Sequence, residues 1–301
     1  MLESFAEHRC IIGDCSVSIA RVQVDGRKKM AKLEGRVALV TGSGRGIGQQ
    51  VALQLAAEGA RVVVNDLDDA PAAETVELIK NNGGEAVACV GSVTEADFAQ
   101  RFIDTAMDNY GDVHIIVNNA GYTWDATIQK MSEEQFDAIL DVHLKAPWRI
   151  LKAASEIIRI KSKGEAERGE RVMRKVVNIS SIAGSRGNAG QTNYSSAKSA
   201  VIGLAKTLAK EWGRYNVCVN AVAFGMIETR LTEAADEKTE IEIDGNKVPI
   251  GIPSAMVAAS AMMIPLGRSG TPTEAAGAVV MMCLPESDYV SGQLLEVTGG
   301  M

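Results

Sequence analysis

The feature that most constrains the fold of this 301-residue sequence is a regular alternation of short apolar runs with longer helical stretches. From Met30 onward, the run "RVALVT" precedes "QQVALQLAAEG", and the run "RVVVN" precedes "AAETVELIKNNG". Five more apolar runs follow: "EAVACV", "VHIIVNN", "KVVNIS", "NVCVNAV" and "QLLEV". Strands that are apolar throughout and separated by helices are typical of a parallel sheet covered on both faces. The sequence therefore predicts one α/β domain over residues 30–301, with a doubly wound parallel sheet of seven strands.

Glycines and charged residues mark the predicted ends of helices and one predicted loop. Gly59, Gly83 and Gly111 stand where helices should end, because glycine readily adopts the left-handed conformation that closes a helix. The segment "KSKGEAERGERVMR", Lys161 to Arg174, is highly charged and precedes the fifth strand. We predict a solvated loop for this segment.

A long connection follows the sixth predicted strand. Residues 225–266 are rich in Met, Ala and Pro, and long connections in such folds are often lids, so we predict a substrate lid there. Within it, Thr239 to Ile252 alternates around Asp244-Gly245, which predicts a β-hairpin. At the start of the chain, residues 1–29 show no clear period, and we expect a poorly structured extension.

Composition argues against several classes of function. A net charge of −7 without a long block of Lys and Arg argues against nucleic-acid binding, and 4% aromatic residues argue against base stacking. Five scattered cysteines form no C-x-x-C pair, so neither a disulfide framework nor a zinc site is expected. No apolar run approaches the roughly 18 residues of a membrane span. We expect a cytoplasmic protein that binds a small molecule, with no metal site.

A glycine-rich turn follows the first predicted strand. In "VALVTGSGRGIG", Gly42, Gly46 and Gly48 stand between a strand and the start of a helix. Glycines there allow the backbone to approach a pyrophosphate, and the helix N-terminus attracts its negative charge. The strand before and the helix after the turn predict a nucleotide site.

Asp66 bears on the choice of nucleotide. It follows the second strand, roughly 20 residues after the glycine turn, where a carboxylate can accept hydrogen bonds from ribose hydroxyls. Its charge would repel a 2′-phosphate, so the sequence favours NAD(H). Arg45 within the turn could attract that phosphate, which keeps NADP(H) open. The simpler alternative is that Asp66 and Asp68 cap the next helix.

A second group of polar residues predicts acid/base chemistry. Tyr194 and Lys198 in "YSSAK" are four residues apart, hence on one face of a helix. A nearby ammonium would lower the pKa of the tyrosine toward the working range of an acid/base group. Ser181 in "NISSIAG" follows a strand, where its hydroxyl could hold a substrate carbonyl. A Tyr-x-x-x-Lys pair alone would more often be a solvated helix face.

Taken in order, these motifs resemble the short-chain dehydrogenase/reductase family over Met30 to Met301. The matching stretches are "TGSGRGIG", "NNAG", "NISSIAG", "YSSAK", "NAVAFGMIET" and the closing segment "GRSGTPTEAAGAVVMMCLPESDYVSGQLLEVTGG". The resemblance implies a single Rossmann domain, usually in a homotetramer, that transfers hydride between nicotinamide and a carbonyl or alcohol carbon. By the same resemblance Tyr194 is the general acid/base, Lys198 holds the nicotinamide ribose and Ser181 orients the carbonyl. The cofactor-binding residues it implies are Gly42, Arg45, Gly46, Ile47, Gly48, Asp66, Leu67, Ser92, Val93, Asn119, Ala120, Gly121, Tyr194, Lys198, Phe224, Gly225, Ile227 and Thr229.

Three positions depart from the family pattern. Ser92 replaces an Asp, so the adenine contact there would come from the backbone, and Phe224 replaces the Pro before Gly225. His143, within "FDAILDVHLKAPWRILKAA", replaces an Asn whose backbone carbonyl holds a relay water in the family. His143 is thus a candidate catalytic or supporting residue through that relay, with a purely structural role as the alternative.

Within the family, "GNAGQTNYSSAKSAVIGLAKTLAKEW" is similar to the 3-oxoacyl-[acyl-carrier-protein] reductases. The stretches "VVVNDL" and "DVHL" are similar to the (3R)-hydroxyacyl-CoA dehydrogenases, which use NAD. The resemblance therefore favours a 3-oxoacyl or 3-hydroxyacyl thioester of acyl-carrier protein or CoA as substrate. A steroid, a quinone or a sugar alcohol is the main alternative, and a non-catalytic nucleotide-sensing scaffold is a remote one.

Overall fold

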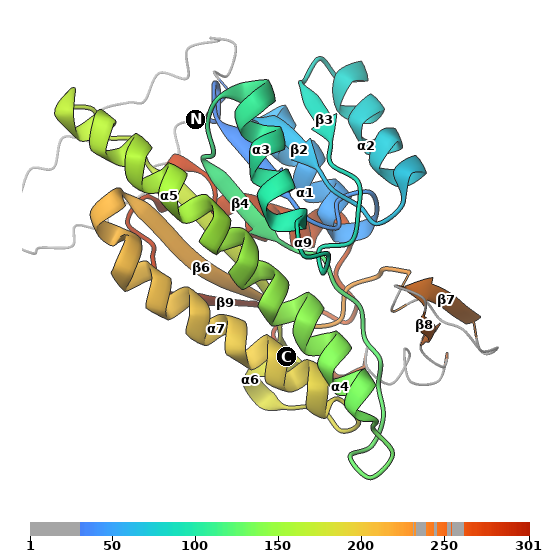
Figure 1. Cartoon of the computed structure of the whole chain (residues 1–301). Helices are drawn as coiled ribbons and strands as arrows, with labels where there is room; N and C mark the ends of the chain where they lie inside the picture. The colour runs from blue at the N-terminus through green and yellow to red at the C-terminus, as the bar shows by residue number, and fades with distance from the viewer. Residues whose placement is uncertain (1–30, 231, 233–238, 244–245, 252–253, 255–261) are drawn as a thin grey trace, which may run out of the picture. The chain divides into compact units, whose positions relative to one another are not determined.

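The computed structural model describes residues 31–230, 232, 239–243, 246–251, 254 and 262–301. Its centre is a seven-stranded parallel sheet in the order β3-β2-β1-β4-β5-β6-β9, which confirms the predicted Rossmann-type sheet (Figure 1). The strands of this sheet are β1 (Val37–Val40), β2 (Arg61–Val64), β3 (Ala86–Ala88), β4 (Ile115–Asn118), β5 (Arg174–Ser181), β6 (Val217–Phe224) and β9 (Leu294–Val297). The strand order reverses between β1 and β4, and ligands of such sheets bind beyond the carboxyl ends of the strands at this point.

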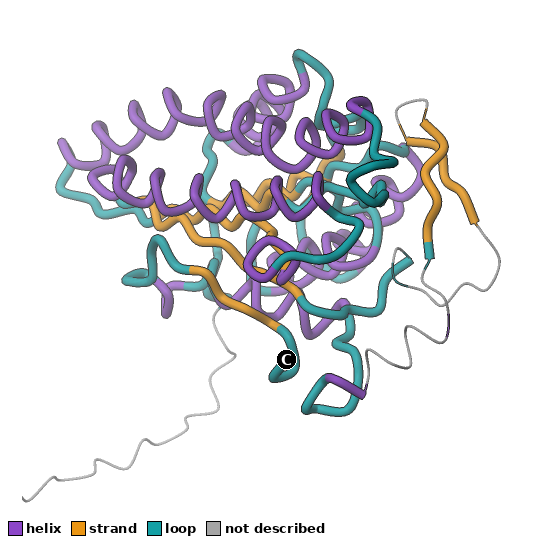
Figure 2. The backbone as a smooth tube through the Cα atoms, turned by 90° about the horizontal axis from the view of Figure 1, so that it is seen from below, coloured by secondary structure: helices purple, strands orange, loops and turns teal. Residues whose placement is uncertain are grey.

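Helices cover both faces of the sheet, as Figure 2 shows from below. One layer contains α3 (Phe98–Tyr110), α5 (Ala146–Glu167) and α7 (Thr192–Trp212). The opposite layer contains α1 (Gly46–Ala57), α2 (Asp69–Asn81) and α9 (Pro272–Met281). Two shorter helices, α4 (Glu133–Leu140) and α6 (Ile182–Arg186), pack against α7.

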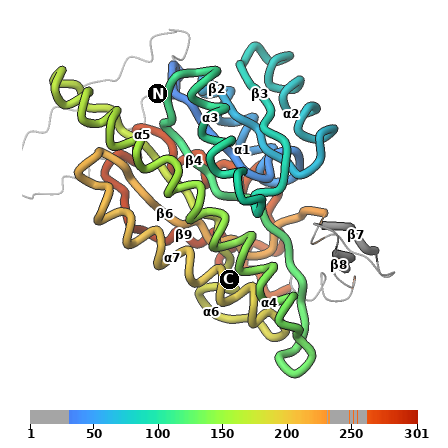
Figure 3. The backbone as a smooth tube through the Cα atoms, viewed as in Figure 1, coloured from blue at the N-terminus to red at the C-terminus, as the bar shows by residue number. Residues whose placement is uncertain are grey.

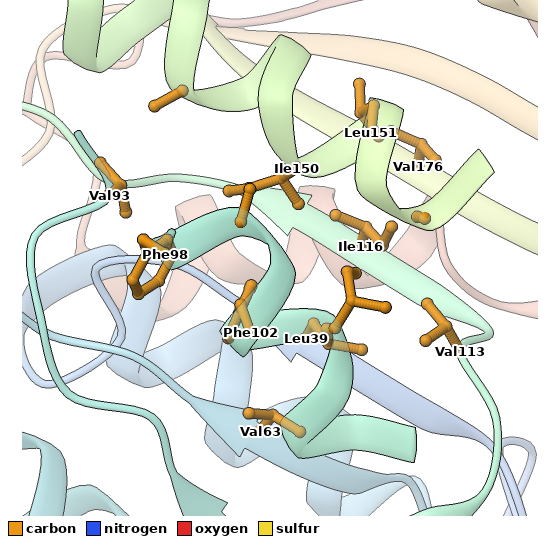
Figure 4. Packing of buried hydrophobic residues seen from close by; sticks show 14 of the residues in the cluster. Leu39, Val63, Val93, Phe98, Phe102, Val113, Ile116, Ile150, Leu151 and Val176 are labelled. Atoms are coloured by element: carbon orange, nitrogen blue, oxygen red, sulfur yellow. The ribbon is translucent and has the colours of Figure 1, made fainter. Parts of the chain in front are cut away.

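The apolar strands are explained by two separate cores, one on each face of the sheet. Successive side chains of a strand point to opposite faces, so in β1 Leu39 packs toward α3 and α5 while Val40 packs toward α1. Figure 4 shows Leu39 and Ile116 of the sheet beside Phe102 of α3 and Ile150 of α5. A strand between two cores must be apolar at every position, which is the pattern in the sequence.

The predicted helix ends and the predicted hairpin are confirmed. Gly111 closes α3 with φ of 76°, and Gly59 and Gly83 follow the ends of α1 and α2 with φ of 95° and 81°. Strands β7 (Thr239–Ile243) and β8 (Asn246–Ile250) pair antiparallel in a separate two-stranded sheet (Figure 1). Figure 3 traces the seven-stranded sheet and its helices as a continuous backbone in the same view. The predicted turn at 244–245, much of the predicted lid and all of the extension at 1–29 lie outside the described residues.

The predicted solvated loop at Lys161–Arg174 is only partly correct: residues 168–173 form a largely exposed loop, but the rest of the segment does not. Helix α5 continues to Glu167, so half of this segment is helical. The Glu165 carboxylate is buried and accepts two hydrogen bonds, of 2.6 and 2.8 Å, from the buried Arg174 guanidinium. Arg174 also donates to Asp112 at 3.2 Å and to the Val113 carbonyl at 3.1 Å. Two charges of this segment, Glu165 and Arg174, thus belong to a buried network, which composition alone could not distinguish from a solvated loop.

The long helical stretch around His143 is interrupted. Between α4 and α5, residues Asp141–Lys145 form one turn of π-helix, in which the chain is wound wider than in an α-helix. Such single turns are rare in proteins, and many of them lie at functional sites. The turn contains His143, whose side chain is only 3% exposed.

Candidate active site

The turn between β1 and α1 is shaped by contacts that only glycine allows. A Cβ atom on Gly48 would lie 2.1 Å from the Gly42 carbonyl oxygen, and one on Gly42 would lie 2.8 Å from the Cα of Ala120. Gly42 and Gly46 also have φ of 61° and 57°, which disfavours any other residue. The turn leads into the N-terminus of α1 at Gly46, where backbone N–H groups can receive a phosphate.

The segment after β4 is tied to this turn by hydrogen bonds. Asn119 Nδ2 donates to the carbonyls of Thr41 and Gly42 at 3.0 and 2.9 Å. The backbone N–H groups of Asn119 and Ala120 donate to the Thr41 hydroxyl at 2.9 and 3.0 Å. Asn119, Ala120 and the glycine turn therefore lie together at the point where the strand order reverses, as the resemblance implies.

Asn65 joins the ends of the first three strands, and sequence reasoning missed it. Its side chain accepts from the N–H of Gly42 at 3.2 Å and donates to the carbonyls of Cys89 and Gly91, both at 3.0 Å. It is 1% exposed. The sequence offered one signal for Asn65: it is a polar residue directly after an apolar strand and next to Asp66, which is predicted to bind the cofactor.

Asp66 and Arg45, the two charged residues that bear on the choice of cofactor, have different partners in the structure. Asp66 accepts from the N–H of Gly44 at 3.0 Å, so its carboxylate lies against the glycine turn. Arg45 pairs instead with Asp68, at 3.1 Å between Nη1 and Oδ2. The charge that could attract a 2′-phosphate is therefore already partnered. Helix α2 begins after Asp68, which makes no side-chain cap bond, so the capping alternative receives no support from this residue.

The other residues expected to bind the cofactor differ in exposure. Leu67 is 40% exposed, whereas Val93, Phe224 and Ile227 are nearly buried. The family resemblance implies that Val93 packs on the adenine ring. In the structure Val93 packs near Phe98 in the core beside α3 (Figure 4), so little of its surface is left for that ring. The remaining expected residues lie in or next to the ends of these elements: Ile47 is in the first turn of α1, Ser92 follows β3, Gly121 follows β4, and Gly225 and Thr229 follow β6.

Ser181, Tyr194 and Lys198 come together at the carboxyl end of β5. Ser181 is the last residue of β5, and its hydroxyl forms a hydrogen bond with Tyr194. Lys198 lies one helical turn after Tyr194 on α7, with Nζ 5.6 Å from the centre of the phenol ring. The Lys198 ammonium donates to the Ile179 carbonyl at 2.7 Å. The structure thus brings together the three residues that the sequence motifs singled out.

The charge states in this cluster differ from the expectation. Burial raises the pKa of Tyr194 to about 12, although the hydrogen bond from Ser181 lowers it. Burial lowers the pKa of Lys198 to about 7. Contrary to the expectation, the pKa of Tyr194 is not lowered in this state, because desolvation of the buried phenol is the largest influence on it. Tyr194 is therefore a neutral phenol, which can donate a proton.

Two further contacts position this cluster and were missed. Buried Asn193 donates to the carbonyls of Trp124 and Gln135 at 3.0 and 3.1 Å, and its side chain accepts from the N–H of Tyr194 at 2.7 Å. A Cβ atom on Gly184 would lie 2.5 Å from the backbone carbon of Lys198, so glycine lets α6 approach α7 there. Neither residue type indicates such a role without the tertiary contacts.

The geometry has the two parts of a dinucleotide-dependent enzyme: a turn that only glycine can build, between β1 and a helix N-terminus, and an acid/base cluster at the carboxyl end of β5, with β4 between the two strands. The residues present fit a dinucleotide, because the close backbone contacts at Gly42 and Gly48 hold the turn tightly against the N-terminus of α1, where backbone N–H groups can receive a phosphate. A family model described as "short chain dehydrogenase" matches residues 36–240. The chain belongs to this family, whose members are oxidoreductases that bind a nicotinamide cofactor.

Similar proteins have names that concern acyl chemistry. A 3-oxoacyl-[acyl-carrier-protein] reductase of Synechocystis sp. is 39% identical over 275 residues, which cover 90% of this chain and 99% of that protein. The protein of the same name from Thermotoga maritima is 35% identical over 270 residues, covering 90% and 99%. A (3R)-3-hydroxyacyl-CoA dehydrogenase of Rattus norvegicus is 36% identical over 278 residues, covering 90% and 97%.

The part of the chain that the structure describes also bears on membrane spans, metal sites and disulfides. None of its helices is both long enough and apolar enough to cross a membrane. No group of three or more His, Cys, Asp or Glu side chains within it is arranged to hold a metal ion. The described cysteines, Cys89, Cys218 and Cys283, are buried free thiols.

Proposed function

We propose that this chain interconverts 3-oxoacyl and 3-hydroxyacyl thioesters, carried on CoA or acyl-carrier protein, with NAD(H) as cofactor. The observation that carries the proposal is the meeting of Ser181, Tyr194 and Lys198 at the carboxyl end of β5, on the same edge of the sheet as the glycine turn after β1. The substrate class is supported by the names of relatives that this chain matches over nearly their whole length.

Tyr194 is proposed as the proton donor in the reductive direction. The bound nicotinamide supplies the hydride when the carbonyl carbon is reduced. The Ser181 hydroxyl orients the substrate carbonyl, and the neutral phenol of Tyr194 donates its proton to the carbonyl oxygen. With its pKa raised to about 12 the phenol is protonated at physiological pH, so it carries the proton that the carbonyl oxygen needs. A nearby positive charge would help it to release that proton.

Lys198 is proposed to assist by charge and by position. Its buried Nζ lies over the phenol ring, and with a pKa of about 7 part of the population is protonated near neutral pH. In that form the positive charge stabilises the phenolate that forms as the proton leaves. Its hydrogen bond to the Ile179 carbonyl fixes Nζ at the end of β5. By family resemblance the same ammonium binds the nicotinamide ribose.

The preference for NAD(H) is supported by the two charged residues near the glycine turn. The Asp66 carboxylate lies where it would bind ribose hydroxyls and repel a 2′-phosphate, while Arg45 is paired with Asp68. The test is oxidation of NADH and NADPH with acetoacetyl-CoA, followed at 340 nm. We expect turnover with NADH, and turnover with NADPH alone would refute the argument from Asp66. Turnover of a steroid, quinone or sugar-alcohol panel without acetoacetyl-CoA would refute the thioester assignment.

The mechanism is tested by Tyr194→Phe. We expect kcat to fall by about 10² to 10⁴, the usual contribution of a positioned acid, while the Kd for NADH, measured by fluorescence, stays within about twofold. Tyr289→Phe is the matched control, because Tyr289 is fully exposed, and it should retain the activity of the native enzyme. A Tyr194→Phe enzyme as active as the control would refute the role of the phenol.

A further inference from the structure

His143 lies where three elements of the site meet. It belongs to the π-helical turn between α4 and α5. Its imidazole stands edge-on to the ring of Tyr194, with ring centres 5.0 Å apart and an interplanar angle of 88°. On its other side it packs against the segment after β4, where a Cβ atom on Gly121 would lie 2.0 Å from the His143 Cε1 atom. The imidazole therefore fills the space between Tyr194 and the segment expected to line the cofactor cleft.

The hydrogen bonding of His143 defines its tautomer. Nε2 lies 2.6 Å from the Tyr122 carbonyl oxygen, and a carbonyl can only accept, so Nε2 carries the proton. Burial and the charge of Lys198 hold the pKa of His143 well below its ordinary value, so the ring is neutral. Nδ1 is then a buried lone pair, with no hydrogen-bond partner among the residues that the structure describes.

A merely space-filling side chain would not need this arrangement. A buried polar atom without a partner carries a desolvation cost, and a hydrocarbon side chain of similar size would fill the same space without it. The feature that a hydrocarbon cannot reproduce is the Nε2–H bond to Tyr122. The charged residues of the same turn, Asp141 and Lys145, pair with each other at 3.3 Å.

We propose that His143 is a positioning residue, whose neutral Nε2–H tautomer ties the Gly121–Tyr122 segment to α4 and α5 and holds the ring of Tyr194 in its reactive orientation. The inference rests on the proposed function in one respect, namely that Tyr194 is the proton donor. His143 itself transfers no proton.

The test compares His143→Gln with His143→Leu. The amide nitrogen of Gln can occupy the position of Nε2 and restore the bond to Tyr122, whereas Leu has a similar volume and no donor. We expect kcat to fall about tenfold in His143→Leu, equivalent to about 1.4 kcal/mol, with the KM for acetoacetyl-CoA changed less than twofold. His143→Gln should recover kcat to within about threefold of the native enzyme.

His114 provides the matched control. It is largely buried, and its Nδ1 accepts from the Val37 N–H at 3.1 Å, but it precedes β4 and so lies at the opposite end of the sheet from the site. His114→Leu should lower Tm and leave kcat unchanged. If His143→Leu likewise lowered Tm alone, or if His143→Gln recovered nothing, the positioning role would be overturned.

A second measurement decides the matter even if His143→Leu does not fold. In protein labelled with ¹⁵N-histidine, His143 should show the neutral Nε2–H tautomer at pH 7, its signal assigned by its loss in His143→Gln. An imidazolium or an Nδ1–H tautomer would overturn the inference. Because this spectrum needs no substrate, it stands even if acetoacetyl-CoA is not turned over, which would refute the proposed function alone.

Discussion

Replacing Lys198 by Met should make this protein more stable and inactive. The Lys198 ammonium is 4% exposed, and burial lowers its pKa from 10.5 to about 7. A difference of this size corresponds to about 5 kcal/mol. Below about pH 7 the Lys198 amine is charged in both the folded and the unfolded state, so the folded protein bears the full cost of burying the charge. Between pH 7 and 10.5 the unfolded chain still binds this proton and the folded protein does not. The free energy of unfolding therefore rises as the pH rises through this range, and above pH 10.5 the cost of burying the charge is absent.

The magnitude for Lys198→Met follows from two opposing effects at pH 7. Removing the ammonium relieves most of the 5 kcal/mol, while leaving the Ile179 carbonyl without its donor costs about 1–3 kcal/mol. We therefore expect the free energy of unfolding to rise by about 2–3 kcal/mol.

The assay is urea denaturation of both proteins at pH 7 and at pH 9.5. The advantage of Lys198→Met should shrink by pH 9.5, because the native enzyme gains stability as its own penalty is relieved. Lys206→Met on the exposed face of the same helix is the control, and it should change stability by less than about 0.5 kcal/mol. A Lys198→Met protein less stable than native at pH 7, or a difference independent of pH, would refute this reasoning.

Two further substitutions test the glycine turn and the buried ion pair. Gly48→Ala should weaken NADH binding at least tenfold in titrations of cofactor fluorescence, because its Cβ would meet the Gly42 carbonyl at 2.1 Å and displace the turn; unchanged affinity would contradict the proposed cradle. Glu165→Ala should lower the free energy of unfolding by about 3–5 kcal/mol, because it leaves the Arg174 guanidinium buried with less compensation. Urea titration checks this, and a loss below about 1 kcal/mol would show that Asp112 alone suffices.

The sheet and the main site were predictable because both are local in the sequence. Apolar runs such as "RVALVT" indicate strands between two cores, and glycines such as Gly111 mark helix ends. Tyr194 and Lys198 are four residues apart on a helix, so the sequence alone places them on one face.

The errors and omissions share another cause. Lys161 to Arg174 was predicted as a solvated loop because charge usually indicates exposure, yet Glu165 and Arg174 meet in the interior. Asn65 and Asn193 were missed because their partners are backbone carbonyls of distant segments. Sequence patterns do not record which carbonyls remain unpaired at the end of a strand.

The sequence by itself determined the fold class, the family and the residues of the acid/base cluster, because these depend on period, on turn chemistry and on short spacings. Tertiary structure alone decided the charge states. A tyrosine and a lysine four residues apart suggest a lowered tyrosine pKa, but burial raises that pKa to about 12 and lowers the pKa of Lys198 to about 7. It also decided the state of His143, because desolvation and a carbonyl 21 residues away in the chain define its tautomer. Electrostatics depends on what surrounds a group in space, and a linear sequence does not contain that information.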